Sequence, residues 1–155
     1  MLFRSKPLWQ LPLGPFNNDN GHGSSPVIVD DMVLLICDQD TNSYYLAVDK
    51  LTGKIRYKVE RPETTRGYAT PSVWRPKSGP AELIVPGAYV TTAYELKTGK
   101  KLWWAGGMAW QLKGAPVVVG DTMYLNSWES GGDTETPPPV EDWVTVSSKF
   151  DRDGD

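Results

Sequence analysis

An internal repeat constrains the fold of this chain more than any other feature of its sequence. Residues 47–57 and 93–103 share one pattern, in which an alternating apolar segment leads into Thr-Gly-Lys and a second segment ends on a large aromatic. The two repeated glycines, Gly53 and Gly99, are 46 positions apart. A period of this length that is built only from strand patterns is typical of β-propeller blades.

Prolines recur nearly in step with this pattern, because Pro26, Pro71 and Pro116 are 45 positions apart and apolar β-forming residues follow each one. We therefore expect an all-β chain that forms a partial β-propeller of four-stranded antiparallel blades, with two complete blades and partial ones beside them. The strands expected for these blades are 25–29, 32–37, 44–48 and 54–59, then 69–75, 82–85, 90–95 and 100–104, and for the start of a third blade 115–119 and 122–128.

The repeated residues also resemble a known family pattern, Ala-x-Asp-x-x-Thr-Gly-x-x-x-Trp. Its positions are Ala47, Asp49, Thr52, Gly53 and Tyr57 in the first copy and Ala93, Glu95, Thr98, Gly99 and Trp103 in the second. The pattern is similar to the PQQ-type β-propeller repeat, which is found in quinoprotein dehydrogenases and in the outer-membrane assembly lipoprotein BamB. Tyr57 replaces the Trp of the family, and Glu95 replaces its Asp. The resemblance covers roughly residues 5–128 and implies a structural role for the repeated residues.

The chain divides into three parts by composition. Residues 1–128 hold the repeats, residues 129–139 form a Gly- and Pro-rich linker, and residues 140–155 change to a helical spacing of apolar positions. Residues 6–11 align with the last strand of each blade and place Trp9 where Tyr57 stands in the repeat. Since so few blades cannot close a ring, we interpret the sequence as a fragment of a longer propeller. Expressed alone, it should be poorly soluble or self-associating, because its outer blades lack neighbours.

The last five residues predict part of a calcium site. Asp151, Asp153 and Asp155 occupy the spacing of positions 1, 3 and 5 of an EF-hand loop. Residues 140–150 would form its entering helix, and the parent gene would continue with the glycine and the glutamate that such a loop needs. The alternative interpretation is an ordinary acidic linker.

Other candidate catalytic and ligand residues have simpler structural explanations. His22 stands between glycines and has no evident acid partner for a nucleophilic triad, so we interpret it as a loop histidine. Cys37 ends an apolar strand and is expected to be a small buried hydrophobe. A single cysteine cannot form the vicinal disulfide that the resemblance associates with quinoproteins of the methanol dehydrogenase type.

Three polar segments complete the set of candidates. Asp38, Asp40 and Asn42 could approach a cation, although a polar turn between two strands explains them as well. Residues 61–66 are expected to form a solvated loop between blades. Residues 100–104 mix cations and aromatics as single-strand nucleic-acid binders do, but their repetition of residues 54–57 indicates blade structure.

Charge and hydropathy narrow the range of binding partners that the sequence predicts. A net charge of −3 and a pI near 5.2 argue against nucleic acid, and no apolar run reaches the roughly 20 residues of a transmembrane helix. The family resemblance implies a non-catalytic propeller scaffold in the periplasm or outside the cell, although the start of the chain holds no signal peptide. It would bind a protein partner and the missing blades of its own propeller, with calcium at the tail as its cofactor. The alternative is a fragment of a PQQ-dependent quinoprotein dehydrogenase, in which PQQ is the cofactor.

Overall fold

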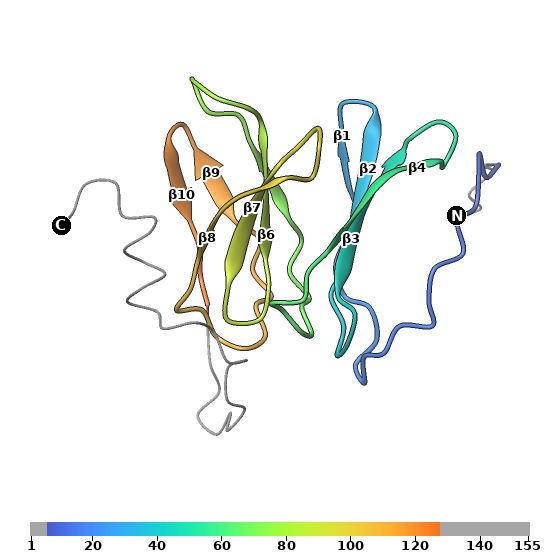
Figure 1. The fold of residues 1–155 in the computed structure, drawn as a ribbon, viewed down its shortest axis with the longest axis horizontal. Helices are drawn as coiled ribbons and strands as arrows, with labels where there is room; N and C mark the ends of the chain where they lie inside the picture. The colour runs from blue at the N-terminus through green and yellow to red at the C-terminus, as the bar shows by residue number, and fades with distance from the viewer. Residues whose placement is uncertain (1–5, 128–155) are drawn as a thin grey trace, which may run out of the picture.

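The computed structural model describes residues 6–127, which form three antiparallel sheets and no helix. Sheet 1 contains, in spatial order, β1 (Val27–Val29), β2 (Met32–Cys37), β3 (Tyr44–Asp49) and β4 (Ile55–Glu60). Sheet 2 contains β5 (Ser72–Trp74), β6 (Glu82–Pro86), β7 (Thr91–Glu95) and β8 (Lys101–Ala105). Sheet 3 is the pair of β9 (Val117–Val119) and β10 (Thr122–Tyr124). Figure 1 shows the three sheets standing side by side in the order of the chain.

The expected plan of two four-stranded antiparallel sheets is confirmed, but the first strand of each sheet begins later than predicted. The first strand of each sheet is shorter than the sequence predicts, because it begins at Val27 and at Ser72 rather than at residues 25 and 69. The residues before these strands bond between sheets instead. The Ser24 hydroxyl donates to the Ala69 carbonyl at 3.1 Å, and the Ser25 N–H donates to the Thr70 hydroxyl at 3.2 Å.

The two large sheets share one register. Ala47 lies opposite Tyr57 in sheet 1, and Ala93 lies opposite Trp103 in sheet 2. Each sheet has its register shift directly after this alanine. The repeated Thr-Gly turns are therefore followed by the same irregularity, which places the two aromatics at equivalent positions.

The main core lies between sheets 1 and 2. Sheet 1 contributes inward side chains from β2 and β3, and sheet 2 contributes side chains from β6, β7 and the turn after it. The buried members of this cluster are Met32, Leu34, Ile36, Tyr45, Ala47, Leu83, Val85, Tyr94 and Leu96. Because both sheets bury one face in this cluster, each sheet depends on the other for its apolar burial.

Sheets 2 and 3 meet at their first strands. β5 lies against β9, where the Ser72 hydroxyl donates to the Pro116 carbonyl at 2.5 Å and the Trp74 indole N–H donates to the Gly120 carbonyl at 3.1 Å. On the other side, Arg75 forms an ion pair with Asp30 at 2.8 Å. The residues directly after β5 and β1 thus add an ion pair between sheets 2 and 1.

One further expectation is not met, and two others concern residues that the structure does not describe. Residues 6–11 do not form the expected last strand of a blade, because in the described part of the chain no strand runs beside them to complete a ladder. The linker at 129–139 and the short helix expected at 140–150 lie outside the described residues. Across residues 6–127 there is no helix of the length and apolar character that crossing a membrane requires.

Candidate functional site

A large aromatic joins sheet 1 to sheet 2 at the repeated Thr-Gly turn. The Tyr57 hydroxyl of β4 donates to the Leu96 carbonyl at 2.6 Å. Its ring lies so close to Gly99 that a Cβ there would stand 3.0 Å from two ring carbons. Gly99 also has a φ of 75°, a conformation that side-chain-bearing residues rarely adopt. We call this contact of a ring and its hydrogen bond on a Thr-Gly turn the aromatic dock.

A second aromatic dock lies one repeat earlier. The Trp9 indole N–H donates to the Lys50 carbonyl at 2.9 Å, and a Cβ on Gly53 would stand 2.6 Å from the Trp9 ring. Lys50 follows the acidic residue of its motif by one position, as Leu96 does in the second copy. Although residues 6–11 are not a strand, Trp9 therefore makes the contact that Tyr57 makes.

The acidic residue of the motif stabilises the turn on which the ring docks. One carboxylate oxygen of Asp49 accepts from the Leu51 N–H, the Thr52 N–H and the Thr52 hydroxyl at 2.9–3.0 Å. In the second copy the Thr98 hydroxyl donates to Glu95. Arg56 donates to the other oxygen of Asp49 at 2.7 Å and holds the pKa of that carboxyl below its usual range. These contacts explain the Asp-x-x-Thr spacing as turn chemistry.

Trp103 differs from the other two aromatics. Its indole N–H donates to the Glu82 carboxylate in its own sheet at 2.7 Å, and its side chain is half-buried. Ala47 and Ala93, which lie opposite Tyr57 and Trp103, are both buried. Small residues are needed there because a ring covers each one from the neighbouring strand.

A buried ion pair at the opposite end of sheet 1 is not predicted by the sequence. Arg61 follows β4, Asp38 follows β2, and neither side chain is exposed to solvent. The guanidinium donates to both carboxylate oxygens of Asp38, at 2.8 and 3.0 Å. It also donates to the Tyr94 hydroxyl of β7 at 2.8 Å, so the pair joins the two sheets.

Further polar groups extend this pair to the surface. The Tyr94 hydroxyl lies 3.3 Å from the Glu63 carboxylate, which accepts from Lys101 at 2.9 Å. We call Asp38, Arg61, Glu63, Tyr94 and Lys101 the buried polar network. It corrects the expectation that residues 61–66 form a solvated loop. The repeat could not reveal Arg61, because Gly107 stands at the corresponding position of the second copy.

Small residues make room for the network. A Cβ on Gly87 would stand 2.7 Å from the Arg61 guanidinium and 2.4 Å from the Thr64 hydroxyl. That hydroxyl accepts from the Ala88 N–H at 2.8 Å, which fixes the turn between β6 and β7 against the segment that carries Arg61. The network is therefore built into the packing of both sheets.

The electrostatics of the network indicate a structural role. Burial raises the pKa of Asp38, and the adjacent Arg61 guanidinium opposes that rise. Burial raises the pKa of Tyr94 to about 12, so its hydroxyl stays protonated at neutral pH. Burial also disfavours the charged form of Glu63, but the hydrogen bond from Lys101, a backbone hydrogen bond and the charges of Lys101 and Arg61 together outweigh it and lower the pKa of Glu63. Both carboxylates of the network are thus engaged with cations rather than held ready for proton transfer.

The remaining candidates also have local explanations. The exposed His22 ring stacks on Phe16 with a centroid distance of 4.8 Å. Cys37 is a buried free thiol, and burial raises its pKa to about 11, which disfavours the nucleophilic thiolate. Asp40 forms an ion pair with Arg66, as Asp38 does with Arg61. Asn42 lies in the turn that follows, with a φ of 60°.

Metal ligands are the last candidates to be placed. No group of three or more His, Cys, Asp or Glu side chains among residues 6–127 gathers as a cation site. Asp151, Asp153 and Asp155 lie outside the described residues, so the calcium loop stays a prediction. No protein-family model matches this chain, and no curated protein matches its sequence.

Proposed function

We propose that this chain is a segment of a non-catalytic, PQQ-like β-propeller that serves as a protein-binding scaffold in the periplasm or outside the cell. The observation that carries the proposal is the aromatic dock, which recurs with the same ring-to-turn contact at Trp9 and at Tyr57. A contact that repeats with the sequence period is what a ring of similar blades requires, because each blade must cover the next in the same way.

The chemistry of the described residues supports a scaffold over an enzyme. Asp38 and Asp40 are each paired with an arginine, and Cys37 is a buried thiol with a raised pKa. Because the two carboxylates are held in ion pairs and the thiol is buried, these groups are suited to packing rather than to substrate chemistry.

Titration with PQQ distinguishes the scaffold from the alternative, a piece of a PQQ-dependent dehydrogenase. The full chain would be titrated with PQQ in the presence of calcium, while the cofactor absorbance and the dye-linked oxidation of alcohols and aldoses are measured. A scaffold should give neither a saturable change in the cofactor spectrum nor turnover. Saturable PQQ binding with turnover would overturn the proposal and favour the dehydrogenase.

The propeller arrangement itself is tested through the dock. Trp9→Ala and Tyr57→Ala should both lower the urea midpoint of unfolding, because each ring covers the turn of a neighbouring sheet. A loss below about 1 kcal/mol in the unfolding free energy of Tyr57→Ala would remove the main support for this arrangement.

The calcium loop belongs to the same proposal. We propose Asp151, Asp153 and Asp155 as the first three ligands of an EF-hand loop. Calorimetric titration of the full chain with calcium should show weak binding that Asp151→Ala abolishes, because three carboxylates at this spacing surround one cation. Equal heats for the two proteins would reduce these residues to an acidic segment.

A further inference from the structure

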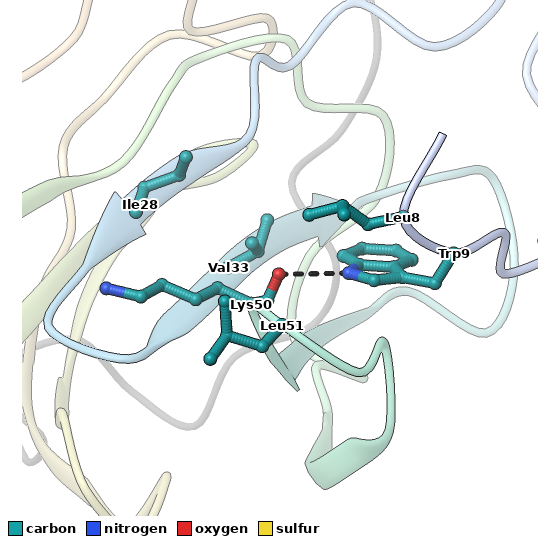
Figure 2. Close-up of a pocket in the computed structure, with 6 residues that line it drawn as sticks. All are labelled: Leu8, Trp9, Ile28, Val33, Lys50 and Leu51. Atoms are coloured by element: carbon teal, nitrogen blue, oxygen red, sulfur yellow. Dashed lines mark hydrogen bonds between the residues drawn. The ribbon is translucent and has the colours of Figure 1, made fainter. Parts of the chain in front are cut away.

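The two ends of the row of sheets carry apolar faces with exposed side chains. The first-sheet face consists of Leu8, Trp9, Ile28, Val33 and Leu51, which surround a groove of about 390 Å³ together with Lys50. Figure 2 shows these side chains around the groove, beside the Trp9 hydrogen bond to Lys50. The third-sheet face consists of Val117, Val119, Thr122 and Tyr124 on β9 and β10. Ile28 is 70% exposed and Val119 is 63% exposed, so residues 6–127 leave both faces open.

The first-sheet face is the equivalent of a surface that is buried elsewhere in this molecule. In sheet 2, Val73 lies opposite Leu83, and both pack into the core against sheet 1. In sheet 1, the corresponding pair is Ile28 opposite Val33. The groove on sheet 1 therefore corresponds to the surface of sheet 2 against which sheet 1 packs.

The third-sheet face is the equivalent of the other half of the same interface. Sheet 1 turns Met32 and Leu34 toward sheet 2, with Val29 packed against them. Val29 lies opposite Met32 across the turn between β1 and β2. In sheet 3, Val119 lies opposite Thr122 across the same turn, and Tyr124 stands in the position of Leu34. The third-sheet face thus corresponds to the surface of sheet 1 that packs against sheet 2.

We propose that the third-sheet face of one copy of this chain docks on the first-sheet face of a second copy, head to tail. The occupant is a second copy because both halves of one interface, which is already formed between sheets 1 and 2, stand exposed at opposite ends of the same chain. Trp9 is in place for this contact, since it already docks on the Thr-Gly turn of sheet 1 as Tyr57 docks on that of sheet 2. The docked sheet would lie beside Trp9 as β1 and β2 lie beside Tyr57.

The character of the two faces fits this association. All four residues of the third-sheet face are uncharged, and Lys50 is the one charged residue that lines the groove of the first-sheet face. Burial of apolar side chains such as Ile28 and Val119 supplies the driving force. A head-to-tail contact is heterologous, so it forms a ring where the rotation between copies closes and an open chain of copies where it does not. The inference rests on the proposed repeat of equivalent sheets, but not on the absence of catalysis.

Sedimentation velocity with two complementary variants tests the geometry. Ile28→Lys charges only the first-sheet face, and Val119→Lys charges only the third-sheet face. Wild type should show a sedimentation coefficient that rises with protein concentration. Each variant alone should stay a monomer, with association weakened at least about tenfold, because a buried lysine would lose its hydration. An equal mixture of the two should form dimers and nothing larger, since one intact face of each kind remains.

Controls keep every outcome decisive. Ser78→Lys adds the same charge in the connection between β5 and β6 and should associate as wild type does. Circular dichroism checks the fold, and Leu51→Lys with Tyr124→Lys form a second pair if either first variant fails to fold. A monomeric wild type, variants that associate like wild type, or a mixture that stays monomeric would each overturn the proposal. A monomeric wild type in which Tyr57→Ala is still destabilising would leave the proposed propeller arrangement standing.

Discussion

Arg61 shows how one side chain can hold two sheets together. Its guanidinium is fully buried and donates to Asp38 in sheet 1 and to Tyr94 in sheet 2. Removing a buried charge of this kind leaves its partner without compensation, and that loss costs far more than the pair itself contributes. The position is therefore sensitive to substitution although nothing in its sequence context marks it.

Arg61→Met should destabilise the protein by about 3–5 kcal/mol, because the Asp38 carboxylate would be left buried and unpaired. Asp38→Leu combined with Arg61→Met should recover most of this loss, since neither charge then remains in the core. Urea unfolding of the wild type, both single variants and the double variant measures the coupling. A single variant within about 1 kcal/mol of wild type would contradict the assignment of a dry, bidentate pair.

Gly99→Ala should cost about 2–4 kcal/mol, which combines strain at a φ of 75° with a Cβ placed 2.5 Å from a Val59 methyl group. Gly21→Ala is the matched control, because Gly21 has a φ of 74° and nothing lies within 4 Å of an added Cβ. The difference between the two losses in chemical denaturation isolates the contact with the aromatic dock. Equal losses would show that the dock tolerates the extra methyl group.

At the scale of the elements, the turn between β3 and β4 carries the most concentrated electrostatics. Arg56 bridges Asp49 at 2.7 Å and Asp31 at 2.5 Å, so it connects this turn to the turn between β1 and β2. The hydrogen bonds from Arg56 lower the pKa of both carboxyls. The Arg56 guanidinium of β4 thus connects the end of β3 with the turn between β1 and β2.

This turn should make stability depend on acid. The pKa of Asp49 is lower in the folded chain than the value of about 3.9 in an unfolded one, so its contribution is present above that value and is lost as the pH falls below it. Asp49→Asn should be less stable than wild type at pH 7, and its stability should fall less steeply between about pH 5 and pH 2. Thermal unfolding across this range measures the slope. Parallel curves for wild type and Asp49→Asn would refute the assignment.

At the scale of the whole molecule, sheets 1 and 2 are packed as one unit and sheet 3 is attached to sheet 2. The first two share a core in which side chains from both are completely buried. Within residues 6–127, sheet 3 has two short strands, and its outer face is exposed. A two-stranded sheet is marginal by itself, so β9 and β10 depend on their contact with β5.

Leu83→Ala tests this unit, because Leu83 of sheet 2 is buried against sheet 1. The substitution should cost about 2–5 kcal/mol in unfolding free energy through the cavity that it leaves. Hydrogen exchange should accelerate in β2 and β3 as much as in β6 and β7, since one core stabilises both sheets. Faster exchange confined to sheet 2 would show that the two sheets unfold separately.

The sequence alone determined the features that repeat with its period. The Thr-Gly turns, the alternation along β2 and β3 and the equivalent places of Tyr57 and Trp103 follow from local turn chemistry and side-chain alternation, which act over a few residues. The order of strands within each sheet follows as well, because neighbouring strands joined by short turns pair with one another.

Only the tertiary structure decided the features that depend on distant, unrepeated partners. Arg61 is buried because Asp38 and Tyr94, which are 23 and 33 positions away, meet it between the sheets. Ser25 and Ala69 lie outside the strands predicted for them because each bonds to the neighbouring sheet. Residues 6–11 lack a strand, yet Trp9 docks, because a ladder requires a neighbouring strand whereas an indole requires only one carbonyl and a glycine to lie against.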